Sequence, residues 1–457
     1  MGDTVLMQLI QSIPFFCTFF LFLLNLAIKR KFFCISSLSL LYVSAAMLGS
    51  ILLVEKPRTG VPYVRLDAMI FLSICFILLC LPALFFKDGK KDNDLKFVDL
   101  PDNVVRFTTY TLCILTVPAS LFYLYRSIPP LLFYLSSNLG RGAFRDSLEF
   151  GNNFSSIESF ITRCGATFGY CAFFMAIYCF ALKKQKFWVI LLLFFGALAT
   201  AIDSLKTVTR FVIFHNMIFC AVCVILFLAI IPEERKHTIK RFFLLFFVIM
   251  SIPFMAISIA RFKDNIIYSM VSYFATGPYS FNVDYAARTE GGVKAGNGYL
   301  ICGLHYYIYD KILDTDTYTE KQLYFENFYW GGDQRLGNSP EIDNIYRGIS
   351  GAYSGEFKTI AGMFLLDFSP GGVLLLMFLI SILFSVAFMK GKIRSPAGTL
   401  LAAFYFYILI LSVMGWTFVG KFGFMVVCLI LLFCLHLHIQ RKKALRSLHS
   451  PDEQQNL

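Results

Sequence analysis

The chain has 457 residues, of which 57% are hydrophobic, 17% aromatic and only 15% charged, and its mean hydropathy is +0.67. Soluble domains carry about 25% charged residues, so this chain cannot cover a single water-soluble core with a polar surface. The same composition excludes a disordered chain, and 13 cysteines are too few for a secreted disulfide scaffold.

The sequence therefore predicts an all-α polytopic membrane protein. In a soluble protein the formal net charge of +12 would favour nucleic-acid binding, but in a membrane protein much of such an excess marks topology. We expect no nucleic-acid partner. The sequence contains no P-loop, paired Cys-x-x-Cys, His-Glu-x-x-His or tandem repeat, so we expect no metal and no cofactor.

A helix needs about 20 apolar residues to cross the hydrocarbon core. Eleven segments of the chain fit this length: residues 5–28, 34–54, 68–86, 107–125, 166–182, 187–203, 211–231, 242–260, 371–389, 397–416 and 422–440. The first segment does not resemble a cleavable signal peptide, because no Lys or Arg precedes Lys29 and no small-residue cleavage site follows.

The basic residues predict the orientation of these spans. Alternate short loops and the C-terminal tail carry most of the Lys and Arg, beginning with Lys29, Arg30 and Lys31 after the first span. The positive-inside rule then places the N-terminus outside and the C-terminus in the cytoplasm.

This topology divides the chain into four parts. Residues 1–260 hold spans one to eight, with an outer loop at about 126–165, and residues 261–370 form a large periplasmic loop. Residues 371–440 hold the last three spans, and residues 441–457 form a cytoplasmic tail. In the large loop we expect short amphipathic helices at 265–274 and 342–353, and we expect function there because long loops commonly carry it.

The basic residues differ in kind between the two faces. The cytoplasmic loops use mostly Lys, whereas the outer loops use mostly Arg. Lys suffices as a topology charge, but Arg adds a planar fork that binds phosphate or carboxylate with two hydrogen bonds. An outer face rich in Arg and Tyr suggests a bound anion beside stacked sugars or lipid.

Two arginines lie at the outer ends of adjacent spans. Arg210 precedes the seventh span, and Arg261 closes the eighth. Each fits an interfacial arginine that extends towards the headgroups. At one membrane depth, however, the two would repel each other unless an anion such as a diphosphate lay between them.

The segment from Ile360 to Gly372 is a helix that breaks. It begins as an apolar stretch, and Asp367-Phe-Ser-Pro-Gly-Gly interrupts it before the span from Val373. Pro370 suits the first turn of the next helix, with Asp367 or Ser369 as its N-cap. We therefore predict a re-entrant half-helix, which is tolerated only where it lines protein or a wet cavity.

These features resemble the Wzy-type oligosaccharide repeat-unit polymerases of bacterial O-antigen and capsule. The matching stretches are Thr-Arg210, Ala-Arg261, Tyr273-Phe-Ala-Thr-Gly-Pro-Tyr-Ser-Phe281, Asn344-Ile-Tyr346 through Tyr353 and Glu356 to Leu-Asp367-Phe-Ser-Pro-Gly-Gly, and the basic Asn138-Leu-Gly-Arg141-Gly-Ala-Phe-Arg145. The chain departs from the family where Ser-Pro replaces a Gly after Phe368 and where the usual Gly is missing before Arg210.

The resemblance implies an inverting, membrane-embedded glycosyltransferase on the periplasmic face of the bacterial inner membrane. Its donor is a growing glycan on undecaprenyl diphosphate, and its acceptor is a single repeat unit on the same lipid. The glycan moves en bloc to the acceptor hydroxyl, and the lipid diphosphate leaves. No nucleotide sugar is required, and a polysaccharide chain-length regulator is a further implied partner.

This chemistry needs cations at the leaving diphosphate and a base at the acceptor hydroxyl. Arg210 and Arg261 are the candidate cations, and His305 and Asp367 are candidate catalytic groups on the acceptor side. The candidate substrate-binding residues are Arg141, Arg145, Arg288, Arg335, Tyr346, Arg347 and Tyr353. Glu290, Asp343 and Glu356 are further candidate carboxylates, and a capping or turn role is favoured over catalysis for each of the four carboxylates.

Other roles stay open for the outer loop. His305, which is followed by Tyr306 and Tyr307, also fits an ordinary position in a surface loop. The many tyrosines between residues 306 and 329 could stack on sugars or form an interfacial aromatic belt. Cys164 and Cys302 could pair in an oxidising compartment.

Two other functions are alternatives to polymerisation. An O-antigen ligase uses a similar scaffold and the same donor, and composition does not separate it from a polymerase. A flippase or other transporter is disfavoured, because transporters usually show internal repeats, helices broken in matching halves and charges at mid-bilayer. Here we expect a single broken element.

Overall fold

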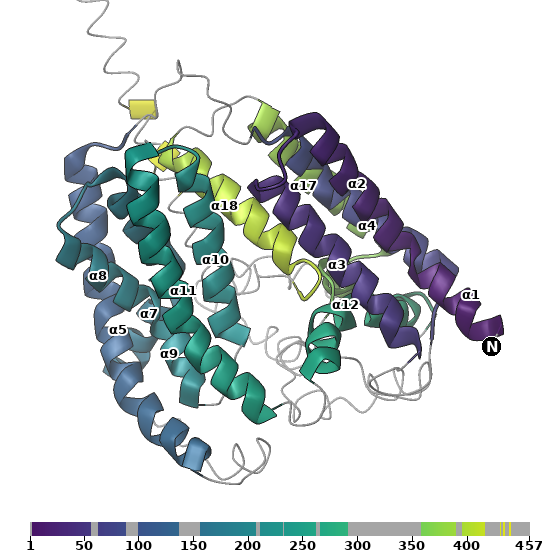
Figure 1. The fold of residues 1–457 in the computed structure, drawn as a ribbon, viewed down its shortest axis with the longest axis horizontal. Coiled ribbons are helices and arrows are strands. Elements are labelled where there is room, and N and C mark those ends of the chain that lie inside the picture. Colours follow the sequence, from purple (N-terminus) through teal and green to yellow (C-terminus); the bar gives the residue numbers. More distant parts are fainter. Residues whose placement is uncertain are drawn as a thin grey trace, which may run out of the picture. The chain divides into compact units, whose positions relative to one another are not determined.

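The computed structural model describes residues 2–55, 63–87, 99–136, 156–206, 211–231, 233–261, 266–290, 358–389 and 395–415, and a few positions between 430 and 439. All regular elements in these ranges are α-helices (Figure 1). They belong to two compact units, one of residues 1–90, 262–391 and 405–423 and one of residues 91–261, 392–404 and 424–457.

Seven helices in the described ranges are long and apolar enough to cross a membrane. They coincide with the predicted spans at 5–28, 34–54, 68–86, 107–125, 211–231, 242–260 and 371–389. The predicted spans at 166–182 and 397–416 are shorter apolar helices, and most of 422–440 lies outside the described residues. The chain is therefore a helical, polytopic membrane protein.

The first unit is built on apolar helices from both halves of the sequence. Its helices are α1 (Gly2–Gln11), α2 (Ile13–Lys29), α3 (Ile35–Glu55), α4 (Leu66–Phe85), α12 (Ile266–Thr289), α16 (Ile360–Asp367), α17 (Pro370–Met389) and the end of α18 (Pro396–Leu411). Helix α2 packs against α3 and α4, α4 packs against α17, and α3 packs against α12.

Aromatic side chains fill the interior where α4, α17 and the end of α18 meet. The ring of Phe86 lies 4.8 Å from that of Phe406, and the ring of Phe384 lies 4.9 Å from that of Tyr405. The buried Tyr405 hydroxyl donates a hydrogen bond of 2.8 Å to the carbonyl of Leu79. The phenol thus buries its ring without leaving its polar group unbonded.

Helix α12 is longer than the sequence predicts. A short helix was expected at 265–274, but the helix continues through Gly277 and Pro278 to Thr289. At Gly277 the chain approaches a neighbouring backbone so closely that a Cβ atom would overlap the carbonyl oxygen of Val413. The polar and helix-disfavouring residues of this segment suggest a loop, but the tertiary contact at Gly277 stabilises it as a helix.

The predicted break between α16 and α17 is confirmed. Thr359 caps α16, because its hydroxyl accepts a 3.0 Å hydrogen bond from the amide of Gly362. The helix ends at Asp367, Phe368 is extended, and α17 begins at Pro370. Ser369 caps α17 by accepting a 3.3 Å hydrogen bond from the amide of Gly372.

The second unit is a group of helices around α5 (Asp102–Ser136). The others are α7 (Ser156–Leu182), α8 (Phe187–Ala197), α9 (Ala199–Lys206), α10 (Phe211–Leu228) and α11 (Glu233–Arg261). Helix α5 packs against α7, α8 and α9, and α10 packs against α7 and α11.

The expectation of a single broken element is wrong. The predicted span at 187–203 is two helices, α8 and α9, which are bent by 45° at Leu198. The Ser120 hydroxyl lies 2.8 Å from the carbonyl of Phe195, to which it donates. A Cβ atom at Gly196 would overlap the Thr116 hydroxyl, so α5 packs directly on the backbone at this bend.

Candidate functional site

Among the predicted catalytic and substrate-binding residues, only Arg288 lies where the structure describes the side chain, as it also does for the further candidate carboxylate Glu290. The backbone is also described at Arg261, which ends α11, and at Asp367, which ends α16. The others lie outside the described residues: Arg141, Arg145, Arg210, His305, Arg335, Tyr346, Arg347 and Tyr353. The expected helix at 342–353, Asp343, Glu356, Cys302 and the tyrosine-rich loop also lie outside them.

The prediction that Arg210 and Arg261 share one membrane depth requires α10 and α11 to form a hairpin. The structure packs these helices together, and the ring of Phe214 near the start of α10 lies 6.3 Å from that of Phe254. Arg210 directly precedes α10, and Arg261 is the last residue of α11. The start of α10 thus lies beside the last turns of α11, and a shared anion stays a prediction.

In the first unit, the last turns of α12 hold α16 through two charged side chains. Arg288 Nε donates a 3.3 Å hydrogen bond to the carbonyl of Phe368, at the break between α16 and α17. One turn earlier, the carboxylate of Asp284 forms an ion pair with Lys358, just before α16 begins. The side chain of Asp284 has no solvent exposure, and that of Lys358 is only 11% exposed.

The carboxylate of Asp284 also lies against the first turn of α16. A Cβ atom at Gly362 would be 2.8 Å from Asp284 Oδ2, so a larger residue there would press on the carboxylate. Negative charge is favourable at a helix N-terminus and positive charge at a C-terminus. Arg288 matches this polarity at the C-terminus of α16, whereas at the N-terminus the charge of Asp284 is balanced by Lys358.

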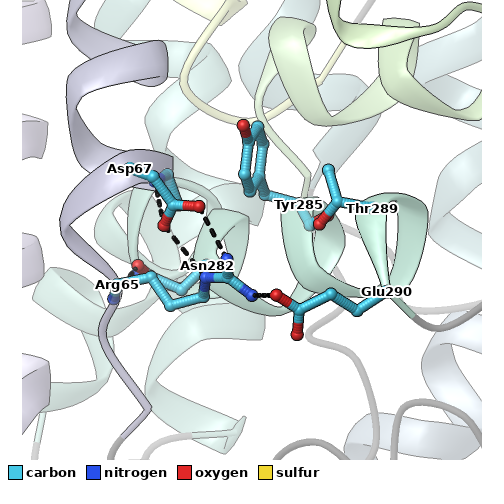
Figure 2. A network of polar contacts seen from close by, with 7 residues as sticks. Arg65, Asp67, Asn282, Tyr285, Thr289 and Glu290 are labelled. Atoms are coloured by element: carbon cyan, nitrogen blue, oxygen red, sulfur yellow. Dashed lines mark hydrogen bonds and ion pairs between the residues drawn. The ribbon is translucent and has the colours of Figure 1, made fainter.

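A second cluster joins the end of α12 to the start of α4 (Figure 2). Arg65 Nε and Nη2 donate to Asp67 Oδ1 and Oδ2 over 2.9 and 2.6 Å, and Nη1 donates to Glu290. The guanidinium lies 5.9 Å from the centre of the Tyr285 ring. The hydrogen bonds from Arg65 to Asp67 raise the pKa of the guanidinium above its ordinary value, although burial opposes this shift.

Buried amides extend this cluster into the unit. Asn282 Oδ1 accepts a 2.9 Å hydrogen bond from the Arg65 amide, and Asn282 Nδ2 donates to Gln11 Oε1 over 3.0 Å. Gln11 in turn donates to the Ser50 hydroxyl over 3.0 Å. Every link in this chain joins residues far apart in the sequence, so the cluster fixes the ends of α1, α3, α4 and α12 together.

Sequence reasoning missed most of this arrangement. From the sequence alone, Arg65, Asp284 and Lys358 receive no individual role, and Glu290 is a candidate base although it pairs with Arg65. One signal was present: Asp284 and Arg288 are four residues apart and lie on one face of any helix that contains them. The described residues contain no cluster of His, Cys, Asp and Glu that could hold a metal ion.

Comparison with protein-family models, curated proteins and solved structures finds no match to this chain. Its function therefore has to be argued from the residues and their arrangement.

Proposed function

We propose that the chain is a membrane-embedded glycosyltransferase that polymerises lipid-diphosphate-linked oligosaccharide repeat units. The glycan of the donor would pass en bloc to a hydroxyl of the acceptor repeat unit, with inversion at the anomeric carbon. The new glycosidic bond replaces the bond to the undecaprenyl diphosphate, which leaves. In this proposal the enzyme lies in the bacterial inner membrane, and its active site faces the periplasm.

One observation carries the proposal. Two of the stretches that resemble the polymerases, 273–281 in α12 and the Asp367–Gly372 break, belong to elements that pack together although about 80 residues separate them. The bond that joins these elements comes from the last turn of α12, beyond the 273–281 stretch, where Arg288 donates to Phe368 over 3.3 Å. A polymerase would need this proximity if both stretches served one site.

The proposed division of roles follows the charges of the reaction. Arg210 and Arg261 would stabilise the departing diphosphate, because fixed cations are most effective where negative charge develops. Asp367, at the end of α16, or His305 would accept the proton of the acceptor hydroxyl. The remaining outer arginines and tyrosines would bind the glycans.

A lipid-linked-oligosaccharide flippase is the second candidate. Two observations favour it: the bend between α8 and α9 is a second broken helix, and the Asp284–Lys358 pair is buried. Broken helices and buried charges are both common in transporters. The O-antigen ligase remains the alternative within the same reaction class.

The surface glycan of the native host separates these functions when the gene for this chain is deleted. A polymerase predicts collapse of the ladder to a single repeat unit, and complementation by the unmodified chain restores the ladder. Loss of even the single repeat would indicate a ligase or a flippase instead. An unchanged ladder would show that the chain does not take part in assembly of the surface glycan.

A further inference from the structure

Helix α16 has eight residues and ends at a break, so its own hydrogen bonds give it little stability. Its position must come from contacts with other elements. Ile360, Ala361, Phe364 and Leu365 are fully buried, which gives α16 an apolar face inside the first unit. Apolar contact alone is not directional and allows a short helix to slide or rotate.

The polar contacts of α16 are directional and come at both of its ends. At the N-terminus, Asp284 pairs with Lys358 and lies against Gly362. At the C-terminus, Arg288 donates to the carbonyl of Phe368. A third contact is the 2.7 Å hydrogen bond from the Ile360 amide to the carbonyl of Ser412.

Both charged side chains come from consecutive turns of α12. Residues four apart on a helix lie on the same face, so one face of α12 reaches both ends of α16. Arg288 has the sign that the helix dipole of α16 favours at its C-terminus, whereas at the N-terminus Asp284 forms a pair with Lys358.

We infer that Asp284 and Arg288 are positioning residues, which hold α16 at its two ends and so fix the place of Asp367. That Asp284 and Arg288 fix the position of α16 is inferred from their contacts alone. Its consequence for Asp367 rests on the proposed function, in which Asp367, the last residue of α16, accepts the proton of the acceptor hydroxyl.

The holding of α16 is measurable in the purified full chain without any substrate. Ala361 is fully buried, so a cysteine in the variant Ala361→Cys reacts with a maleimide only when α16 separates from the unit. The reaction rate at position 361 is read by mass spectrometry of the peptide that carries it. Native Cys75, which is buried in α4 of the same unit, reports any general unfolding.

In the Ala361→Cys background, Asp284→Asn and Lys358→Met should each raise the labelling rate at position 361 by about tenfold or more, since each leaves half of a buried ion pair. The rate at Cys75 should not change. Lys358→Arg keeps the charge, so its labelling rate should lie below that of Lys358→Met. Lys184→Met, which removes a lysine paired with Asp99 at 2.8 Å in the other unit, is the matched control.

Two outcomes would overturn the inference. One is an unchanged rate at position 361 in Asp284→Asn and Lys358→Met. The other is a parallel rise at Cys75, which would make the pair a general stabiliser of the unit. Should Asp284→Asn fail to fold, Arg288→Gln with the same reporter tests the other end of α16, and an unchanged rate there contradicts the inference equally.

The consequence for Asp367 is tested by the polymerisation rate on extracted lipid-linked repeat units. Asp284→Asn should lower kcat with little change in KM, and adding Asp367→Asn should cause no further loss. Independent losses from the two substitutions would overturn the positioning of Asp367. If the unmodified chain forms no polymer, the proposed function fails, whereas the labelling result still decides whether α16 is held.

Discussion

Arg65 shows at the scale of one residue how a charge near a span end can serve tertiary structure. Its guanidinium contacts Asp67 beside it and Glu290 far along the sequence, and its backbone amide donates to Asn282. Its side chain is 22% exposed, while those of Asp67 and Glu290 are 50% and 61% exposed. Ion pairs this exposed contribute little individually, so the planar fork matters more than the charge.

Arg65→Gln should lower the free energy of unfolding by about 1 kcal/mol, because it breaks hydrogen bonds to two carboxylates that remain partly exposed. Thermal unfolding of the detergent-purified chain measures this change. Arg106→Gln is the control, since Arg106 lies exposed on α5 in the other unit. Equal melting temperatures for Arg65→Gln and Arg106→Gln would show that the cluster is not a stabilising contact.

Arg210 carries the residue-scale prediction for catalysis. Arg210→Lys should lose most polymer at a normal protein level, because one ammonium cannot reproduce two parallel hydrogen bonds to a phosphate. The surface-glycan ladder after complementation of the deletion strain measures the loss, with Arg106→Lys as the control. A full ladder from Arg210→Lys would indicate that Arg210 only anchors its span at the membrane interface.

At the scale of elements, contacts with neighbouring segments explain why α12 is helical over its whole length. Its middle holds Gly277 and Pro278, two residues that disfavour a helix interior, yet the helix continues to Thr289. The close approach of the Val413 carbonyl explains why position 277 needs a glycine.

Gly277→Ala should destabilise the protein by about 2–3 kcal/mol, because the new methyl group meets a backbone atom that cannot rotate away. Gly371→Ala is the matched control, since a Cβ atom at Gly371 has no neighbour within 4 Å. Thermal unfolding of both variants in detergent gives the comparison. A melting temperature of Gly277→Ala equal to that of Gly371→Ala would contradict the packing at Gly277.

The two helix breaks show what the sequence can and cannot predict. The break before α17 was predictable because Pro370 and its capping residue act locally. The bend at Leu198 has no proline, and its causes are contacts with Ser120 and Thr116 of another helix. Local signals therefore predicted one break, and tertiary packing made the other.

The same distinction holds for the candidate site. The sequence directed attention to Arg288 and Asp367, because resemblance and loop charge are visible along the chain. It gave no role to Asp284 and Lys358, since the partners are 74 residues apart and no local pattern links them. Burial turns such charges into structural contacts, and burial depends on the fold.

At the scale of the whole molecule, seven apolar helices in the described part of the chain indicate a membrane protein, and the predicted orientation rests on the basic loops. A reporter fused after Gly331 should be active in the periplasm, and one fused after Lys184 should be active in the cytoplasm. Paired alkaline phosphatase and fluorescent-protein fusions measure both. The reverse pattern would invert the predicted topology and contradict the proposal of an active site in the periplasm.

The most direct test of polymerase activity is reconstitution. Lipid-linked repeat units extracted from the deletion strain are incubated with the purified chain in liposomes, and the glycans and free lipid diphosphate are then quantified. We predict glycans of two or more repeat units, with one undecaprenyl diphosphate released for each new bond. Substrate that remains at one repeat unit in the presence of folded protein, whether or not it crosses the bilayer, would contradict it.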